Sequence, residues 1–132
     1  MKIELLHGET CSAILQGFYS VGNALPFGLE KHFYKNALII ELQTLGLTVE
    51  ENKKQEIIYK QKNIGELTLD LVVNNLVLLK LDNQKEQLET EQIEISKNYL
   101  KLTDFEVLLF LNFGLEIEHK RLYLTNDFKK RQ

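Results

Sequence analysis

The chain has one cysteine, one proline and no tryptophan among its 132 residues. A single cysteine, Cys11, excludes a disulfide within the chain. No apolar run approaches the length of a membrane span, so we expect no contact with a membrane. Glu4 and Glu9 also interrupt the N-terminal segment where a secretory signal needs apolar residues. These absences favour a cytoplasmic protein that is stabilised by its hydrophobic core.

An excess of positive charge is also missing. The 16 Lys and Arg residues and the 19 Asp and Glu residues give a net charge of −3. This balance excludes the global basic field that drives tight non-specific binding to nucleic acids. Basic residues do gather locally, and the candidate nucleic-acid-binding residues are Lys53, Lys54, Lys120 and Arg121. If they bind nucleic acid, the affinity should fall steeply with salt.

The composition and length indicate one domain. Hydrophobic residues make up 44% of the chain and charged residues 27%, which is ordinary for a globular protein. The sequence contains no repeat, low-complexity segment or linker. We therefore expect a single domain over residues 1–126, followed by a polar C-terminal tail over residues 127–132.

The spacing of apolar residues predicts the order of helices and strands. Helical spacing covers residues 8–19 and 29–45, and a change of period then predicts extended segments over residues 47–50 and 55–59. Residues 63–65 read as a hairpin turn, and the alternation of residues 67–72 predicts a strand with one buried face. A second tight turn at Asn74 and Asn75 precedes an apolar central strand over residues 76–81. A helix over residues 86–101 follows, with Leu88, Ile95, Tyr99 and Leu100 as candidates for its inner face. The last predicted elements are a buried strand over residues 105–113 and an alternating edge strand over residues 115–124.

This order predicts an α/β protein, an α+β sandwich in which helices pack on a central mixed sheet of about five strands. Several segments in the same order and spacing resemble the GxxExxR proteins, a branch of the PD-(D/E)XK nuclease superfamily. The similarity extends from about Ile14 to Leu124, and the segments that match best are residues 33–47, 57–73, 98–103, 108–114 and 119–124.

The resemblance implies a particular metal site. In active members, an aspartate ends one strand and an E-x-K triplet lies on the next strand. Two carboxylates and a backbone carbonyl then hold a magnesium ion, which prefers oxygen ligands in octahedral geometry. The metal acidifies a bound water and stabilises the phosphate transition state, while the lysine positions the water. A glutamate and a glutamine from helices complete the site.

Four of these five positions are replaced in this chain. Asp70 matches the aspartate. Lys80 stands at the position of the glutamate, and Asp82 at that of the lysine. Lys31 falls at the helix glutamate and Ile95 at the glutamine. We interpret the domain as a catalytically degenerate nuclease-like module, and therefore not an enzyme.

In this interpretation, the ammonium of Lys80 takes the place of the metal and forms an ion pair with Asp70, so we expect no cofactor. The domain then acts as a binding or structural module whose partner is a protein or a second copy of the chain. The predicted edge strand over residues 115–124 offers a surface for self-pairing, although its charges also resemble those that protect edge strands from pairing.

Two alternatives stay open. A shift of one residue would make Glu30 the helix glutamate, and Asp70, Asp82 and Glu30 would then form a rearranged magnesium site of an active nuclease. Asp82 is displaced by two residues, or roughly 6–7 Å along the strand, from the expected ligand, and metal–ligand distances of about 2.1 Å tolerate such a shift poorly. The second alternative is nucleic-acid binding without cleavage through the four basic residues named above.

Overall fold

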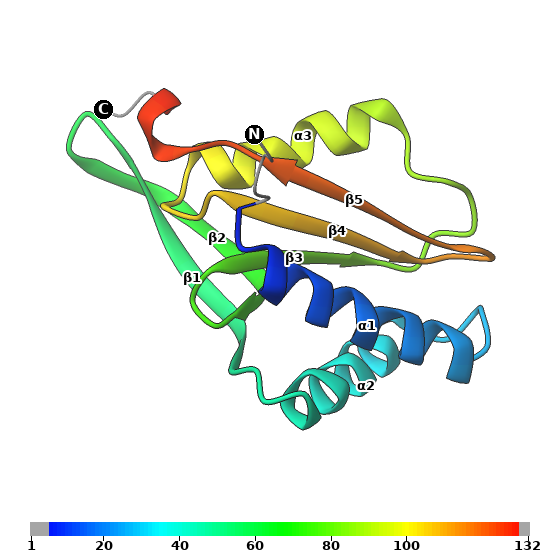
Figure 1. Cartoon of the computed structure of the whole chain (residues 1–132). Helices are drawn as coiled ribbons and strands as arrows, with labels where there is room; N and C mark the ends of the chain where they lie inside the picture. Colours follow the sequence, from blue (N-terminus) through cyan, green and yellow to red (C-terminus); the bar gives the residue numbers. More distant parts are fainter. Residues whose placement is uncertain (1–5, 130–132) are drawn as a thin grey trace, which may run out of the picture.

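The computed structural model describes residues 6–129, which form three α-helices, five β-strands and a short 3-10 helix (Figure 1). In chain order these are α1 (Gly8–Ala24), α2 (Lys31–Thr44), β1 (Val49–Tyr59), β2 (Lys62–Val73), β3 (Val77–Asp82), α3 (Thr90–Lys101), β4 (Val107–Phe113), β5 (Ile117–Tyr123) and η1 (Asn126–Phe128). The predicted order of helices and strands and the predicted α/β class are confirmed.

The five strands form one mixed sheet in the order β1-β2-β3-β4-β5. Neighbouring strands are antiparallel except β3 and β4, which run parallel with Val77 opposite Val107. Parallel neighbours need a crossover connection, and α3 lies within it. Because the order in the sheet follows the order in the chain, β3 is central, and β1 and β5 are the two edges.

Helices cover both faces of the sheet (Figure 1). On one face, α1 and α2 contribute Phe18 and Leu38 to a core that includes Leu71 of β2. On the other face, Leu100 of α3 belongs to a second core with Phe110 of β4. All seven residues of β4 are buried, which explains why its sequence is apolar throughout rather than alternating.

Two predicted boundaries near the N-terminus were wrong. Helix α1 continues to Ala24 instead of ending at Tyr19. Gly22, which we read as part of a break, lies inside the helix where a Cβ atom would approach Cγ2 of Ile117 to 2.7 Å. The glycine is therefore present because α1 passes close to β5, and it does not end the helix.

The first hairpin turn also differs from the prediction. The turn is formed by Lys60 and Gln61, which both have positive φ angles of 48° and 69°, as a two-residue hairpin turn of type I′ requires. Residues 63–65 instead form an irregularity of β2, where Ile57 pairs with Gly65 but Ile58 pairs with Asn63. The predicted turn at Asn74 and Asn75 is confirmed by their φ angles of 52° and 53°.

Helix α3 begins at Thr90 rather than Glu86. Glu89 is its N-cap and forms a capping box with Gln92, which fixes the start of the helix. Of the predicted inner positions, Leu100 is buried, but Ile95 is 54% exposed. The buried Ser96 stands one helical turn before Leu100, so the inner face is rotated by one position from the predicted stripe.

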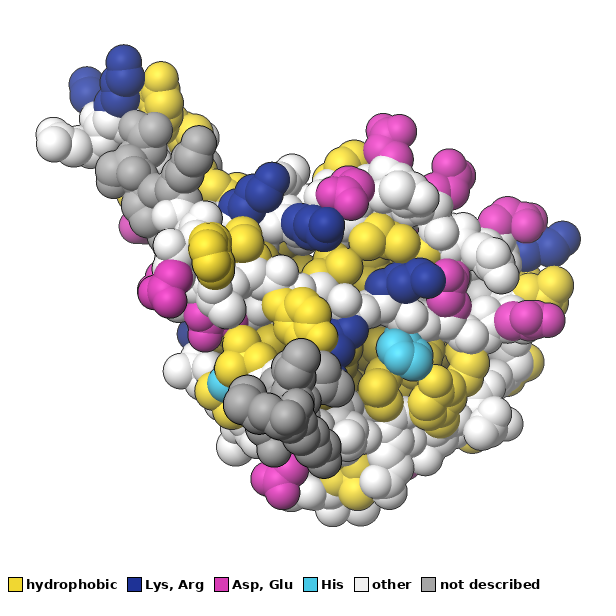
Figure 2. All heavy atoms as spheres, turned by 45° about the horizontal axis from the view of Figure 1, so that its top comes forward, with side chains coloured by type: hydrophobic (Ala, Val, Ile, Leu, Met, Phe, Trp, Pro, Cys, Tyr) yellow, Lys and Arg dark blue, Asp and Glu magenta, His cyan; other side chains and the backbone are white. Residues whose placement is uncertain are grey.

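Strands β1 and β2 extend beyond the sheet as a two-stranded arm. Strand β2 pairs with β3 only through three residues, whereas it pairs with β1 along nearly its whole length. Ile58, Tyr59 and Ile64 near the tip of the arm are 47%, 48% and 64% exposed. Figure 2 shows hydrophobic and lysine side chains together at the far end of this arm, at the upper left.

The C-terminal segment contacts the body of the domain. The residues of η1 are followed by Lys129, whose Nζ atom donates hydrogen bonds to the backbone oxygens of Thr103 and Phe105 at 2.9 and 2.6 Å. The first residues of the predicted tail are therefore held against the domain, and the rest of that tail, residues 130–132, lies outside the described residues. Within residues 6–129, no helix is both long and apolar enough to cross a membrane.

Candidate functional site

Asp70 lies where β2 separates from β3. The regular pairing of the two strands ends at Leu71 and Leu79. Beyond this pair, the Oδ2 atom of Asp70 accepts a hydrogen bond of 2.9 Å from the backbone amide of Leu81. On the other side of β2, Asn52 has a left-handed φ of 54°, and the pair Asn52–Asp70 is missing from the ladder. The distortion reverses the faces of the strand. Residues two apart on a regular strand point to the same side, but Leu69 packs in the core beneath α3 whereas Leu71 packs in the core beneath α1 and α2.

Lys80 projects from the central strand β3 toward α3. Its ammonium nitrogen lies 5.2 Å from the centre of the Tyr99 ring and 5.6 Å from the centre of the Phe110 ring. A cation near an aromatic ring is attracted by the negative charge of the ring face. Asp70, Lys80 and Tyr99 line one small pocket with about 10 Å³ of free space, which is at the lower limit for one ordered water.

The predicted ion pair between Lys80 and Asp70 is wrong. Both side chains line the same pocket, but the ion pairs formed within residues 6–129 do not include one between them. Asp70 directs a carboxylate oxygen to the Leu81 amide, and Lys80 directs its ammonium to the two aromatic rings. The positive charge is therefore held beside Asp70 by aromatic contacts rather than by a direct bond to the carboxylate.

Asp82 ends strand β3, and its carboxylate bonds to the backbone of the next residue. Its Oδ1 atom accepts a hydrogen bond of 2.8 Å from the amide of Asn83. By the alternation of side chains along a strand, Asp82 projects to the same face as Lys80. Its partner across the sheet is Asn112 of β4 rather than a residue of β2, so the pairing does not bring its carboxylate to Asp70.

Glu30 and Lys31 stand at the start of α2, where Glu30 is the N-cap and Lys31 the first helical residue. Both are exposed, and a carboxylate oxygen of Glu30 lies 3.8 Å from Nδ1 of His32. The side-chain Nδ2 of Asn83 donates a hydrogen bond of 2.9 Å to the backbone oxygen of Leu29, so the loop before α2 contacts the end of β3. Across residues 6–129, however, no three His, Cys, Asp or Glu side chains are placed to hold a metal ion.

The four predicted nucleic-acid-binding residues do not form one surface. Lys53 and Lys54 lie on β1 and Lys120 and Arg121 on β5, at opposite edges of the sheet. Lys53 and Lys120 each have a carboxylate within 4.0 Å. Arg121 donates a hydrogen bond of 2.7 Å to the backbone oxygen of Leu6, so it connects the N-terminal segment to the sheet.

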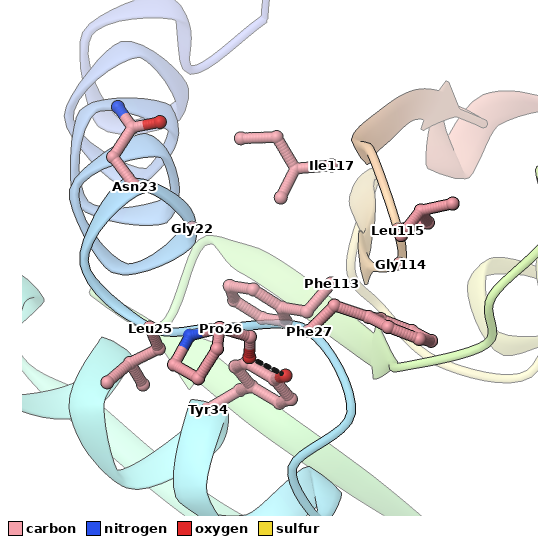
Figure 3. Close-up of a pocket in the computed structure, with 10 residues that line it drawn as sticks. All are labelled: Gly22, Asn23, Leu25, Pro26, Phe27, Tyr34, Phe113, Gly114, Leu115 and Ile117. Carbon is pink, nitrogen blue, oxygen red and sulfur yellow. Dashed lines mark hydrogen bonds between the residues drawn. The ribbon is translucent and has the colours of Figure 1, made fainter.

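A second hollow, larger than the one beside Asp70, lies elsewhere in the domain (Figure 3). It has a volume of about 200 Å³ and lies between the end of α1, the loop before α2 and the turn between β4 and β5. Tyr34 is stacked on Phe113 with ring centres 4.8 Å apart, and its hydroxyl donates to the backbone oxygen of Pro26 at 2.5 Å. This hollow contains no carboxylate, imidazole, thiol or ammonium group, and the hydroxyl of Tyr34 already bonds to Pro26, so we assign no catalytic chemistry to it.

Comparison with known protein families identifies the superfamily of the chain. The model of the PD-(D/E)XK nuclease superfamily matches residues 8–122, nearly the whole chain. The chain belongs to this superfamily. No curated protein and no solved structure gives a significant match. In this PD-(D/E)XK domain, Asp70 on β2 and Lys80 and Asp82 on β3 are the residues that the sequence resemblance assigns to the active-site pattern.

The residues of this PD-(D/E)XK domain do not fit a magnesium ion. Such an ion needs several oxygen ligands and retains part of its hydration shell. Asp70 is the single carboxylate that lines the pocket beside Lys80, and one of its oxygens already accepts a hydrogen bond. The other residues that line the pocket are apolar or aromatic apart from Lys80, whose charge opposes a cation, so the oxygen ligands that the ion needs are missing from it.

Asn112 has a structural role that the sequence analysis did not identify. It is the one polar residue in β4 and is 1% exposed. Its side-chain oxygen accepts from the amide of Gln84 at 3.0 Å, and its amide donates to the backbone oxygens of Gln84 and Glu86 at 3.1 and 3.3 Å. It therefore holds the segment that leads from β3 to α3. A polar residue within an otherwise apolar strand is the signal that would have indicated this role.

His119 connects β5 to α1 and makes the stability of the domain depend on pH. Its Nδ1 atom lies 3.2 Å from the hydroxyl of Tyr19. Burial lowers the pKa of His119 first, the neighbouring Lys120 lowers it further, and Glu118 opposes both. The folded state thus binds this proton more weakly than the unfolded state does.

We therefore expect stability to be lost as the pH falls from about 7 to below the unfolded histidine pKa of about 6.5. Urea unfolding at about pH 7.5 and pH 5.5 will measure the loss. In the variant His119→Gln the loss should be smaller, because a neutral side chain replaces the titrating group. An equal loss in both proteins would show that other groups are responsible.

Proposed function

We propose that this PD-(D/E)XK domain is a divergent member of the GxxExxR type that has lost nuclease chemistry and acts as a binding or structural module. The observation that carries the proposal is the position of Lys80. Its ammonium stands beside Asp70 at the place where the family's pattern has a carboxylate, and Tyr99 and Phe110 hold it there.

Electrostatics supports this proposal. A lysine ammonium in the pocket supplies the positive charge that a metal would supply, and it repels any added cation over a few ångströms. An ammonium cannot acidify a bound water in the manner of a metal ion, because it offers no open coordination position. A positive charge is thus kept in the pocket that Asp70 lines, while the means of activating water is removed.

The rearranged nuclease has less support. It needs the carboxylates of Asp70, Asp82 and Glu30 at one ion. Asp82 and Glu30 each have another neighbour in the structure, the amide of Asn83 and the ring of His32. Neither residue lines the pocket of Asp70. Active chemistry would require the start of α2 and the end of β3 to rearrange together.

A cleavage assay tests the proposal. Purified protein with Mg²⁺ or Mn²⁺ should leave single-stranded and double-stranded DNA and RNA intact. The matched control is the variant Asp70→Asn, which keeps an acceptor for the Leu81 amide and should behave in the same way as the wild type. Metal-dependent cleavage that disappears in Asp70→Asn would refute the loss of chemistry.

A further inference from the structure

The outer edge of β1 is the longer of the two free edges of the sheet. Strand β1 has 11 residues and β5 has seven, and both lie at the ends of the strand order. In Figure 1 no helix of the described chain lies across the outer side of β1. A free edge carries unpaired backbone N–H and C=O groups that can pair with another strand.

The charges along this edge are self-complementary. The segment of residues 50–54 reads Glu-Glu-Asn-Lys-Lys. Reversing its direction and aligning the two copies of Asn52 places Glu50 opposite Lys54 and Glu51 opposite Lys53. Directly opposite side chains on antiparallel strands interact, and opposite charges there are favourable. Four of these five residues, all except Lys53, are exposed.

We propose that two copies of this chain associate through antiparallel pairing of their β1 edges, with Asn52 of each copy on the twofold axis. The proposal goes beyond the loss of nuclease chemistry and does not depend on it. Such a contact uses the same surface on both copies, as a closed twofold dimer requires. Asn52, whose φ angle is left-handed, lies on the axis. The paired residues on its two sides are therefore equivalent by symmetry.

The same register also accounts for exposed apolar residues of the arm. Pairing in this register ends with Val49 opposite Gln55, and beyond that point Tyr59 and Ile58 extend past the start of β1 in the second copy, toward its turn at Leu45 and Gly46. Tyr59, Ile58 and Leu45 are 48%, 47% and 38% exposed in the single chain. A projecting two-stranded ribbon is only marginally stable by itself in water. Contact with the second copy would remove this apolar surface from solvent.

The two glutamates of this segment can exchange the ion pairs that they make within one chain. Lys53 lies 3.5 Å from Glu50, and Lys35 lies 3.8 Å from Glu51. Both carboxylates are more than half exposed, and ion pairs of this kind contribute little to stability. Lys35 also donates a hydrogen bond of 2.9 Å to Oδ1 of Asn52, and Lys54 donates one of 2.7 Å to the hydroxyl of Thr68, so pairing of the edges leaves these two contacts in place or replaces them. The equal numbers of Glu and Lys in residues 50–54 also fit a second copy better than a nucleic acid, whose backbone would be repelled by the two glutamates.

Charge variants test the register directly. In Lys53→Glu/Lys54→Glu the segment becomes wholly acidic, and in Glu50→Lys/Glu51→Lys it becomes wholly basic. Each variant should dimerise at least about tenfold more weakly than the wild type, because like charges then face each other. An equimolar mixture of the two should restore the dimer as a heterodimer, since every acidic position then faces a basic one. The matched control combines all four substitutions, which keeps self-complementarity and should dimerise like the wild type.

Sedimentation equilibrium over about 10–500 µM suits a contact of this small size. The proposal is supported if the wild type and the fourfold variant dimerise, each double variant is a monomer, and the mixture recovers the dimer. A wild type that stays monomeric over this range overturns it. Dimers that persist in both double variants also overturn it, because they would place the interface elsewhere, for example at β5. Circular dichroism of each variant establishes that a monomer is folded.

Discussion

The variant Lys80→Glu/Asp82→Lys is expected to bind divalent cations more tightly than the wild type. The double exchange places a second carboxylate beside Asp70 in the pocket and moves the ammonium two residues along β3, restoring the acidic and basic order of the superfamily. Mn²⁺ should then stabilise the variant. A site with a dissociation constant of about 1 mM would gain about 1.4 kcal/mol at about 10 mM Mn²⁺, or roughly 4 °C in Tm.

Two single variants serve as controls for this experiment. Lys80→Glu without metal should be less stable than the wild type by about 1–2 kcal/mol, because it loses the contacts with Tyr99 and Phe110 and places two carboxylates together. Lys80→Met keeps an unbranched apolar side chain and removes the charge, and it should bind no metal. If Mn²⁺ raises the Tm of the wild type as much as that of the double variant, Lys80 does not take the place of the metal.

The variant Asn112→Ala is expected to lose about 2–4 kcal/mol of unfolding free energy. The substitution removes the partner of three backbone groups of Gln84 and Glu86, and an unsatisfied buried polar group costs about 1–3 kcal/mol. The adjacent chain has little freedom to move away, since a Cβ atom on Gly114 would already lie 2.5 Å from the backbone oxygen of Gln84. Urea unfolding monitored by circular dichroism will measure the change.

The matched control is Asn36→Ala, which removes the same amide from an exposed position of α2. Its unfolding free energy should stay within about 0.5 kcal/mol of the wild type. If Asn112→Ala changes stability as little as Asn36→Ala, the segment between β3 and α3 is held by other contacts. A loss confined to Asn112→Ala would show that this buried side chain fixes the crossover connection.

The order of helices and strands could be predicted because the strongest signals in the sequence are local. The Asn74–Asn75 turn has residues that tolerate positive φ angles. The segments of β3 and β4 are too apolar for strands that have one face in solvent. The first hairpin was misplaced because Gly65 marks an irregularity as readily as a turn, whereas Lys60 and Gln61 have no special preference for positive φ. Gly22 was misread because its reason lies in Ile117, far away in the sequence.

At the candidate site, the replaced positions could be identified from the sequence, but their geometry could not. The spacing of Asp70, Lys80 and Asp82 placed them on adjoining strands. The hydrogen bond from the Leu81 amide to Asp70 follows from the separation of β2 and β3, which no local pattern reports. The rings of Tyr99 and Phe110 reach Lys80 from α3 and β4, so their contact with the ammonium depends on the packing of the whole domain.

The projecting end of the β1–β2 arm gives the molecule regions of unequal local stability. From Lys62 to Glu66, β2 is exposed and pairs with β1 alone, whereas from Leu67 onward its apolar side chains pack against the cores on the two faces of the sheet. Opening the arm therefore exposes little of either core and need not unfold the domain. Insertions and substitutions near Lys60 and Gln61 should therefore cost little stability.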